Sequence, residues 1–337
     1  MPQPTTVGFL LVPGFALMSY AAAVEPLRAA NQLSGQVLYR WWHAAPGKGP
    51  VAASNGVAII PDFTPKDAAA ADLVFVCAGG NPATFDDRAT FAWLRKLARQ
   101  GVTIGGISGG PYILARASLL DGRRATLHWE HAASFHEAFP QVDVVPSLFV
   151  LDADRITCSG GVSALDMMVA LIARDHGHDL AAAVGEWFLL THIREGMGPQ
   201  RMDLRHRLGV SDENLLAVLR AMEANLESPK PRGDLARLAG VSLRQLERLF
   251  RDRLGRGMHA HYLALRLDRA RQLLRETSLP VLDVALATGF GSASQFSRAF
   301  ARSFGEPPSR YREMRAFLAA DTPRHFLPQI KALARAT

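Results

Sequence analysis

A serine flanked by glycines, at residues 106–110 (Gly-Ile-Ser-Gly-Gly), is one feature of this chain that could carry out chemistry. The pattern G-x-S-x-G is typical of a sharp strand-to-helix turn that exposes the serine hydroxyl and directs backbone amides at a bound group. With a histidine base and an orienting carboxylate, such a serine attacks acyl groups. The chain offers His128 or His131 as the base and Asp143 or Asp166 as the acid. The sequence does not show whether these side chains meet in space. A serine hydrolase is therefore one open interpretation.

Arginine, glutamine and serine side chains recur at helical spacing in two C-terminal segments, which begin at Ser242 and at Ser292 and lie within residues 234–255 and 283–305. In each segment the polar side chains share one face of an expected helix, and apolar side chains share the other. Reading of the DNA major groove needs this layout, because arginine and glutamine bond to base edges while the apolar face anchors the helix. A solvated surface helix is the alternative for either segment alone. The candidate DNA-contacting residues are Ser242, Arg244, Gln245, Arg248 and Arg251 in the first segment, and Ser292, Ser294, Gln295, Arg298 and Arg302 in the second.

The two segments belong to a repeat, because residues 234–255 resemble residues 283–305. In each copy a short helix, at residues 235–239 or 284–287, ends at a glycine, which can adopt the left-handed conformation of a sharp turn. A serine then begins the second helix, and the glutamine three residues later can complete a capping box. This order, repeated after about 50 residues, indicates two helix-turn-helix units. The side chains expected to face inward are Leu246, Leu249 and Phe250 in the first copy, and Phe296, Phe300 and Ser303 in the second.

Positive charge is concentrated in the same part of the chain. The whole sequence has a net charge of +7, yet residues 229–315 alone contain 17 Lys and Arg against 8 Asp and Glu, and the rest of the chain is slightly acidic. A local excess of this kind suits a polyanion such as double-stranded DNA.

The N-terminal residues alternate between short apolar runs and helical patterns, which predicts a parallel sheet covered on both faces. A Gly- and Pro-rich stretch then precedes an all-helical region. We therefore expect an α/β sensor domain at residues 1–195, a linker at 196–211, a DNA-binding domain at 212–318 and a tail at 319–337. The expected strands lie at residues 7–12, 73–76, 102–107 and 156–158, and the expected helices at 18–31, 91–100, 112–117 and 164–173.

Cysteine usage and the N-terminus bear on the compartment. Cys77 and Cys158 form no C-x-x-C pair, so a disulfide scaffold or a zinc site is not expected, and a reducing cytoplasm fits. The first residues lack the basic start of a signal peptide, and the apolar run that follows is interrupted by Pro13 and Glu25, which argues against a membrane span. We expect a cytoplasmic protein with no metal and no cofactor.

Residues of about 212–316 resemble the DNA-binding domain of the AraC/XylS family of regulators. The resemblance rests on residues 234–242 (Asp-Leu-Ala-Arg-Leu-Ala-Gly-Val-Ser), on the small residues before Phe296 with the Phe-x-x-x-Phe that follows, and on the Gly-x-x-Pro close that begins at Gly305. It implies that one long helix, at residues 258–276, joins the two helix-turn-helix motifs.

The N-terminal part resembles the class I glutamine amidotransferase-like fold, in its PfpI-like branch, which implies a flavodoxin-like parallel sheet. In that branch the elbow residue is usually a cysteine, assisted by a histidine and by an acid from the first helix. Ser108 stands at the cysteine position, Glu25 matches the acid, and Gly79-Gly80 match a glycine pair near the elbow. A serine is a far weaker nucleophile without a well-placed base, which puts the family's chemistry in doubt.

Both parts together resemble AraC-type regulators of arginine, carnitine and glycine-betaine catabolism, and residues 119–131 carry the matching signature. The resemblance implies that the elbow is a ligand pocket. Amides around Ser108 could hold a carboxylate, and the Trp129 ring with nearby carboxylates could hold a cationic group. Packing roles for Trp129, His128 and His131 are the alternative. The expected ligand-binding residues are Glu25, Gly79, Gly80, Ser108, Gly109, Trp129, Glu130 and His131.

These features together predict a transcription regulator controlled by a small nitrogenous metabolite such as an amino acid or a quaternary amine. We expect no catalysis, and we expect an activator that forms a homodimer and works with RNA polymerase. Two alternatives stay open: a serine hydrolase or amidase fused to a DNA-binding domain, and a nucleoid protein without a preferred DNA site.

Overall fold

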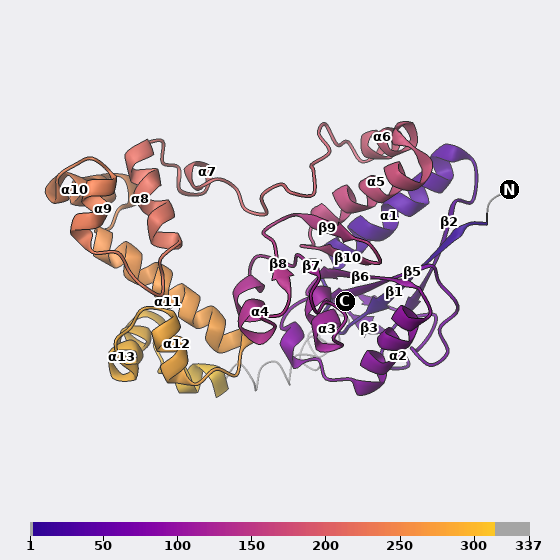
Figure 1. Cartoon of the computed structure of the whole chain (residues 1–337), viewed down its shortest axis with the longest axis horizontal. Coiled ribbons are helices and arrows are strands. Elements are labelled where there is room, and N and C mark those ends of the chain that lie inside the picture. Colours follow the sequence, from indigo (N-terminus) through magenta and orange to yellow (C-terminus); the bar gives the residue numbers. More distant parts are fainter. Residues whose placement is uncertain (1–2, 314–337) are drawn as a thin grey trace, which may run out of the picture. The chain divides into compact units, whose positions relative to one another are not determined.

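The computed structural model describes residues 3–313 and divides the chain into two compact units, residues 1–201 and 202–337 (Figure 1). The expected tail at 319–337 and the last residues of the expected DNA-binding domain lie outside the described residues. The boundary follows Arg201 instead of residue 195, because residues 196–201 are hydrogen-bonded to the first unit.

The first unit is built on a six-stranded sheet with the strand order β2-β1-β5-β6-β10-β9. Neighbouring strands are parallel except β9, which is antiparallel to β10. This arrangement confirms the expected α/β fold class. The strands of the sheet are β1 (Thr5–Leu11), β2 (Tyr39–Ala44), β5 (Leu73–Ala78), β6 (Thr103–Ser108), β9 (Phe149–Asp152) and β10 (Arg155–Cys158), and two small pairs join β3 (Val51–Ala52) to β4 (Ala58–Ile59) and β7 (Arg124–Ala125) to β8 (Asp143–Val144).

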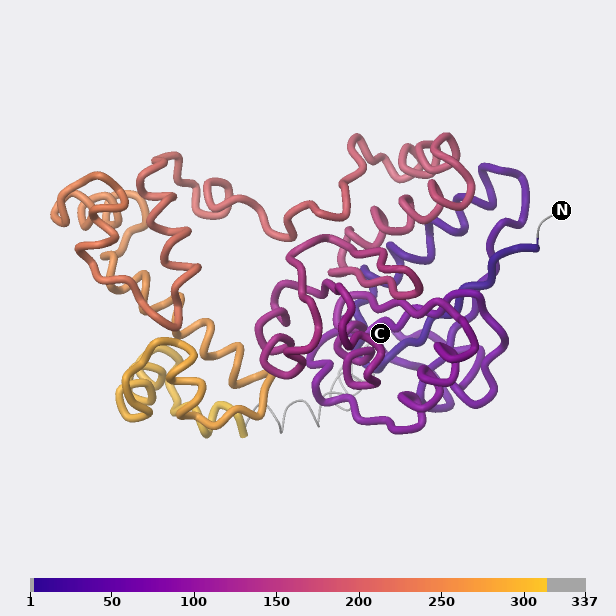
Figure 2. The backbone as a smooth tube through the Cα atoms, viewed as in Figure 1, coloured from indigo at the N-terminus to yellow at the C-terminus, as the bar shows by residue number. Residues whose placement is uncertain are grey.

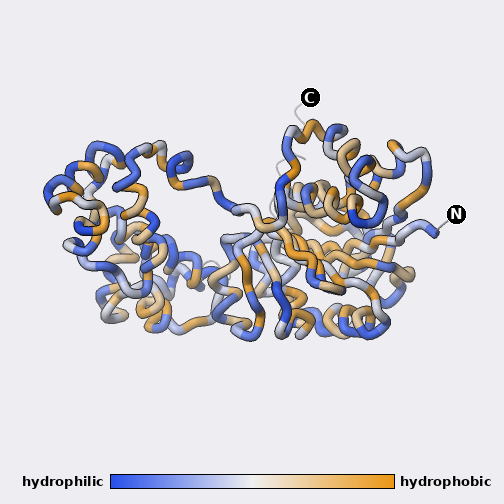
Figure 3. Tube along the Cα trace, turned by 45° about the horizontal axis from the view of Figure 1, so that its top comes forward, coloured by the Kyte–Doolittle hydropathy of each residue, from blue (hydrophilic) through white to orange (hydrophobic). Residues whose placement is uncertain are grey.

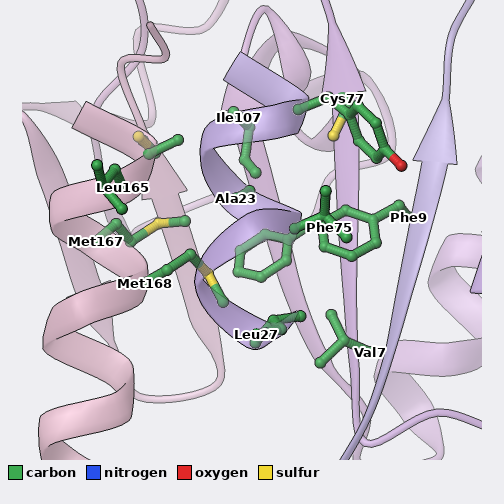
Figure 4. Packing of buried hydrophobic residues seen from close by; sticks show 14 of the residues in the cluster. Val7, Phe9, Ala23, Leu27, Phe75, Cys77, Ile107, Leu165, Met167 and Met168 are labelled. Carbon is green, nitrogen blue, oxygen red and sulfur yellow. The ribbon is translucent and has the colours of Figure 1, made fainter. Parts of the chain in front are cut away.

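Helices cover both faces of this sheet. Alternate residues of each strand point to opposite faces, so β1 sends Phe9 into one buried cluster and Leu10 into the other. Figure 4 shows residues of the first cluster, among them Met167, Leu27 and Phe75, and Figure 3 shows the hydrophobic residues gathered along the strands. The helices on the first face are α1 (Leu17–Ser34), α5 (Ser163–His176) and α6 (His178–Trp187); α2 (Arg88–Arg99) and α3 (Gly110–Arg116) lie on the second, and α4 (Ala132–Ala138) and the 3-10 helix η1 (Pro82–Thr84) complete the unit.

The second unit is helical throughout its described residues, as the sequence predicted. Figure 2 follows its backbone through two similar helix pairs joined by one long helix. That long helix occupies the expected residues 258–276. The helices are α7 (Leu204–Leu208), α8 (Glu213–Glu223), α9 (Arg232–Leu238), α10 (Leu243–Leu254), α11 (Met258–Glu276), α12 (Val281–Ala287) and α13 (Ala293–Phe304).

Helix α11 contributes to two separate buried clusters. Met258 and Tyr262, near its start, pack with α8, α9 and α10. Leu273 and Leu274, near its end, pack with α12 and α13. Between them the Arg266 guanidinium donates hydrogen bonds of 2.7 Å to two carbonyl oxygens in the turn after α12. One continuous helix therefore fixes the positions of both helix-turn-helix units relative to each other.

Within residues 3–313 no helix is long and apolar enough to cross a membrane, and no cluster of three or more His, Cys, Asp or Glu side chains is arranged to hold a metal ion.

Acid should destabilise the second unit through His261. Burial, with a smaller effect of the Arg256 charge, lowers the pKa of His261 to about 4, and Arg256 Nε donates to its Nδ1 at 3.1 Å. The folded state therefore binds fewer protons than the unfolded state between about pH 6.5 and 4, and stability falls as the pH drops through that window. All five tryptophans lie in the first unit, so tryptophan emission follows that unit, and a far-UV circular dichroism transition without a matching change in emission belongs to the second unit. We expect the urea midpoint of the circular dichroism transition to fall with acid, and His261→Phe to flatten that slope. An equal slope in the variant would refute the assignment.

Candidate DNA-reading helices and candidate ligand pocket

The two candidate reading helices, α10 and α13, begin and end in the same way. Ser242 and Ser292 are the N-caps, and the hydroxyl of each accepts a hydrogen bond from the backbone N–H three residues later. Each helix ends at a left-handed glycine, Gly255 with φ 68° and Gly305 with φ 83°. The serine caps that the sequence predicted are confirmed for both copies.

The polar faces of both helices are open to solvent. All ten candidate DNA-contacting side chains are exposed, while the side chains that anchor the helices, such as Phe250 and Phe300, are fully buried. Helix α10 presents its arginines along a surface hollow of about 410 Å³, which is lined by Ser242, Arg244, Gln245, Arg248, Arg251 and Asp252. Ser303, expected to face inward, is exposed, because the small Ala299 takes the inward position beside Phe300.

The capping glutamines distinguish the two helices. The Oε1 atom of Gln245 accepts from the Ser242 backbone N–H at 2.9 Å, which completes the capping box. In the second copy Gln295 donates its backbone N–H to the Ser292 hydroxyl at 3.2 Å, but its side chain makes no return bond. The expected capping box is therefore complete only in α10, and the Gln295 carboxamide remains exposed on α13.

Ser108 lies at the expected elbow, at the end of β6 and two residues before α3. Its φ of +61° is a left-handed conformation that a residue with a side chain adopts only when the surroundings impose it. The surrounding backbone is closely packed: a Cβ added to Gly110 would lie 2.0 Å from the Val76 oxygen, and one added to Gly106 would lie 2.6 Å from the Pro111 nitrogen. The glycines of the G-x-S-x-G pattern are thus needed for the turn itself.

The expected glycine pair lies beside this elbow. Ala78, the last residue of β5, pairs with Ser108 and accepts a hydrogen bond from the Gly109 N–H at 3.0 Å, so Gly79 and Gly80 continue the chain next to the serine. Since the Gly109 amide is already bonded, it is not free to hold a carboxylate.

The first helix brings Ser19 to the elbow. A Cβ added to Gly160 would lie 2.6 Å from Ser108 Cβ and 2.9 Å from Ser19 Oγ, so both serines flank the same point. Ser19 Oγ also accepts from the Gly161 N–H at 2.7 Å. Glu25 lies six residues further along α1, a rise of about 9 Å. Its carboxylate is 43% exposed and pairs with Arg28 at 2.7 Å, so it is not a buried charge that needs a ligand as its partner. The sequence did not predict that Ser19 lies at the elbow, because a serine near the start of a helix is common and belongs to no motif there.

The four groups considered for a catalytic triad have other contacts. Asp166 is buried and pairs with Arg194, and Asp143 lies 3.8 Å from Arg124. The backbone N–H of His128 faces the Ser108 carbonyl oxygen at 3.5 Å, and its Nδ1 lies 4.0 Å from the Glu130 carboxylate. Both candidate acids are therefore paired with arginines, and neither is paired with a histidine in these contacts.

His131 is buried at the start of α4, with its ring 5.9 Å from that of His128. Trp129, between the two histidines, is 43% exposed. The Arg201 guanidinium stacks on its ring at 4.5 Å from the centroid. The ring expected to hold a ligand's cation therefore holds a cation from its own chain. The partners lie 72 positions apart in the chain, and no sequence pattern could have predicted their contact.

The cysteines add no nucleophile to this site. Both are buried free thiols, and burial raises the pKa of Cys77 and, to about 11, that of Cys158. Neither is a thiolate at neutral pH, and neither belongs to the elbow turn.

Family models match both parts of the chain. Residues 5–174 match the DJ-1/PfpI family, and residues 235–314 match a helix-turn-helix domain. The second match covers both reading helices, and the first covers the sheet, the elbow and Trp129.

Relatives and solved structures agree with these matches. The HTH-type transcriptional regulator GlxA of Rhizobium meliloti is 47% identical over 307 residues, which is 91% of this chain and 95% of that regulator. The HTH-type transcriptional regulator CdhR of Pseudomonas aeruginosa is 48% identical over 304 residues, or 90% of each chain. Among solved structures, an AraC family transcriptional regulator from Pseudomonas putida superposes with a TM-score of 0.51 at 28% identity, covering 55% of this chain and all of that one.

The packing of the elbow predicts that Gly110→Ala destabilises the first unit. The new methyl group would meet the Val76 oxygen, and overpacking of this kind costs about 3 kcal/mol. We expect the urea midpoint measured by tryptophan emission to fall markedly. Gly47→Ala is the matched control, since an added Cβ there meets nothing within 4 Å and should change stability by less than about 0.5 kcal/mol. Equal midpoints for the two variants would contradict the geometry.

Proposed function

Because the chain belongs to the DJ-1/PfpI family and is an AraC-type helix-turn-helix transcription regulator, we propose that its first unit is the sensor for a small nitrogenous metabolite. The metabolite controls how the second unit binds DNA. The observation that supports DNA binding by the second unit is the pair of capped helices, each anchored by buried phenylalanine and each presenting exposed arginines.

Each reading helix enters one segment of the major groove. In α10 the arginines at 244, 248 and 251 face the bases or the phosphates, with Ser242 and Gln245 at the helix start. In α13 the exposed Gln295 and Arg298 are the base readers, supported by Ser292, Ser294 and Arg302. Phosphate contacts make affinity fall with salt, whereas base contacts determine which sequence is bound.

The ligand occupies the surroundings of Ser108. Gly79, Gly80 and Gly109 let the chain turn closely around the serine, and the Trp129 face, with the Glu130 carboxylate next to it in the chain, suits an amino, guanidinium or quaternary ammonium group. His131 supports the Trp129 segment from its buried position at the start of α4. For Glu25 to contribute, its carboxylate has to exchange Arg28 for the cation of the ligand.

The assembly we propose is a homodimer that recruits RNA polymerase as an activator in the cytoplasm, where the DNA of a bacterial promoter is found. Relatives named as transcriptional regulators over nearly their whole length support a regulatory role. A hydrolase fused to a DNA-binding domain is the second candidate, and the G-x-S-x-G elbow is the observation that favours it.

The sharpest test of DNA reading is Arg298→Ala. Loss of a two-bond contact with a guanine should cost about 1–3 kcal/mol, or roughly 5- to 150-fold in affinity for the specific site. Non-specific affinity should change little. Arg253→Ala removes the same charge from the other side of α10 and is the control. Electrophoretic mobility or fluorescence anisotropy on specific and scrambled duplexes measures both. An equal loss on both duplexes would mean that Arg298 touches only phosphate.

The sensor proposal predicts that a zwitterion binds and that Ser108 is not a nucleophile. We expect isothermal titration of the full chain with L-arginine, L-carnitine or glycine betaine to give heat with at least one of them. Ser108→Ala should keep both that heat and the ligand's effect on DNA binding. No heat with any zwitterion would refute the ligand class, and turnover of a compound that the variant no longer converts would establish the hydrolase.

A further inference from the structure

The glycines at the start of the expected linker hold the chain against the first unit. The Gly196 carbonyl oxygen accepts from the Leu148 N–H at 2.7 Å. A Cβ added to Gly196 would lie 2.9 Å from the Phe149 oxygen, and one added to Gly198 would lie 3.1 Å from Leu148 Cδ1. Only residues without a side chain allow this approach, so the glycines serve docking.

Gln200 continues the docked segment. Its Nε2 lies within hydrogen-bonding distance of Thr126 Oγ1, of the Leu127 oxygen and of the Ser147 oxygen, at 3.0, 3.0 and 2.7 Å. The Oε1 of Gln200 and the Oγ of Ser147 are buried without a hydrogen-bond partner among the described residues. Unpaired buried polar atoms destabilise the docked state, which therefore can open more easily than a fully bonded one.

Arg201 ends the segment with its guanidinium on the Trp129 ring, 4.5 Å from the centroid. A guanidinium and a quaternary ammonium group bind an aromatic face by the same electrostatic attraction. Two cations cannot stack at contact distance on one face of one indole. Arg201 therefore occupies, from within the chain, the place that a cationic ligand group would take.

The segment that carries Trp129 also reaches the elbow. The His128 N–H faces the Ser108 carbonyl oxygen at 3.5 Å, and the Thr126 N–H donates to Thr157 Oγ1 on β10 at 2.9 Å. Residues 126–129 thus contact the elbow and the docked segment at once. A ligand beside Ser108 that reaches Trp129 would meet Arg201.

Resting on the proposed function, we propose that residues 196–201 form a latch, closed by Arg201 on Trp129 and opened when a ligand's cationic group takes the ring. The Arg194 pair with the buried Asp166 carboxylate anchors the segment just before the latch. Opening frees six residues ahead of the DNA-binding unit, which lengthens its tether by up to about 20 Å. The reach of the tether determines which DNA segments two linked reading units occupy together.

Hydrogen exchange of the full chain tests the latch without any knowledge of the natural effector. Mass spectrometry follows the amides of residues 148–149 and 196–201. We expect Arg201→Gln to speed their exchange severalfold, while Arg99→Gln, which removes an exposed arginine from α2, leaves it unchanged. Tetramethylammonium chloride should speed the same amides in the unmodified protein, relative to sodium chloride at equal ionic strength, and should add nothing in Arg201→Gln.

Affinity gives the second measurement. Tetramethylammonium should bind Arg201→Gln about two- to fivefold more tightly than the unmodified chain, the size of one exposed cation–π contact, as followed by tryptophan emission. Unchanged exchange in Arg201→Gln, or no response of the unmodified chain to tetramethylammonium, overturns the latch. If the latch amides respond as expected while no zwitterion gives heat, the latch stands and the proposed effector class fails.

Discussion

Helix α11 is the constraint on which the DNA-binding unit depends. It is the only described element that contributes to both buried clusters of that unit, and the Arg266 bonds to the carbonyl oxygens of Thr288 and Gly289 tie its middle to the second helix-turn-helix turn. The start of α11 is tied to the residues that follow α8, because the Tyr262 hydroxyl donates a hydrogen bond to the Asn225 carbonyl oxygen. At 19 residues α11 is about 28 Å long. Because α11 is continuous and packs against both helix-turn-helix motifs, it holds the two reading helices in a fixed relative position.

The elbow at Ser108 has the backbone geometry of a nucleophile turn, but the side chains around it differ from those of a catalytic site. The left-handed Ser108 and the crowded glycines on both sides reproduce the turn that exposes a nucleophile in related folds. Yet the first helix supplies Ser19 there, the carboxylates of Asp143 and Asp166 are paired elsewhere, and the thiols are buried away from the turn. The structure therefore shows a strained, closely packed turn in which Ser19 and Ser108 flank Gly160.

The sequence predicted elements where local physics dominates and failed where distant partners decide. Continuous apolar runs placed β1, β5 and β6 to within two residues, and the serine caps placed the starts of α10 and α13. The edge strands β2 and β9 were missed, because residues such as Arg40 and Asp152 interrupt their apolar pattern. For Glu25, helical position alone did not reveal the surface ion pair with Arg28. The Gly-Met-Gly-Pro-Gln stretch has the composition of a linker, and only the approach of Phe149 shows why it is docked.

The unequal capping of the two reading helices gives the DNA site a direction. Gln245 is held by its own helix start, whereas Gln295 is available at the corresponding place on α13. The duplicated halves therefore cannot exchange places on a duplex, and a single protomer bound to an asymmetric site has only one orientation. Reversing that site in a promoter would reverse the order in which α10 and α13 meet the DNA, counted along the gene.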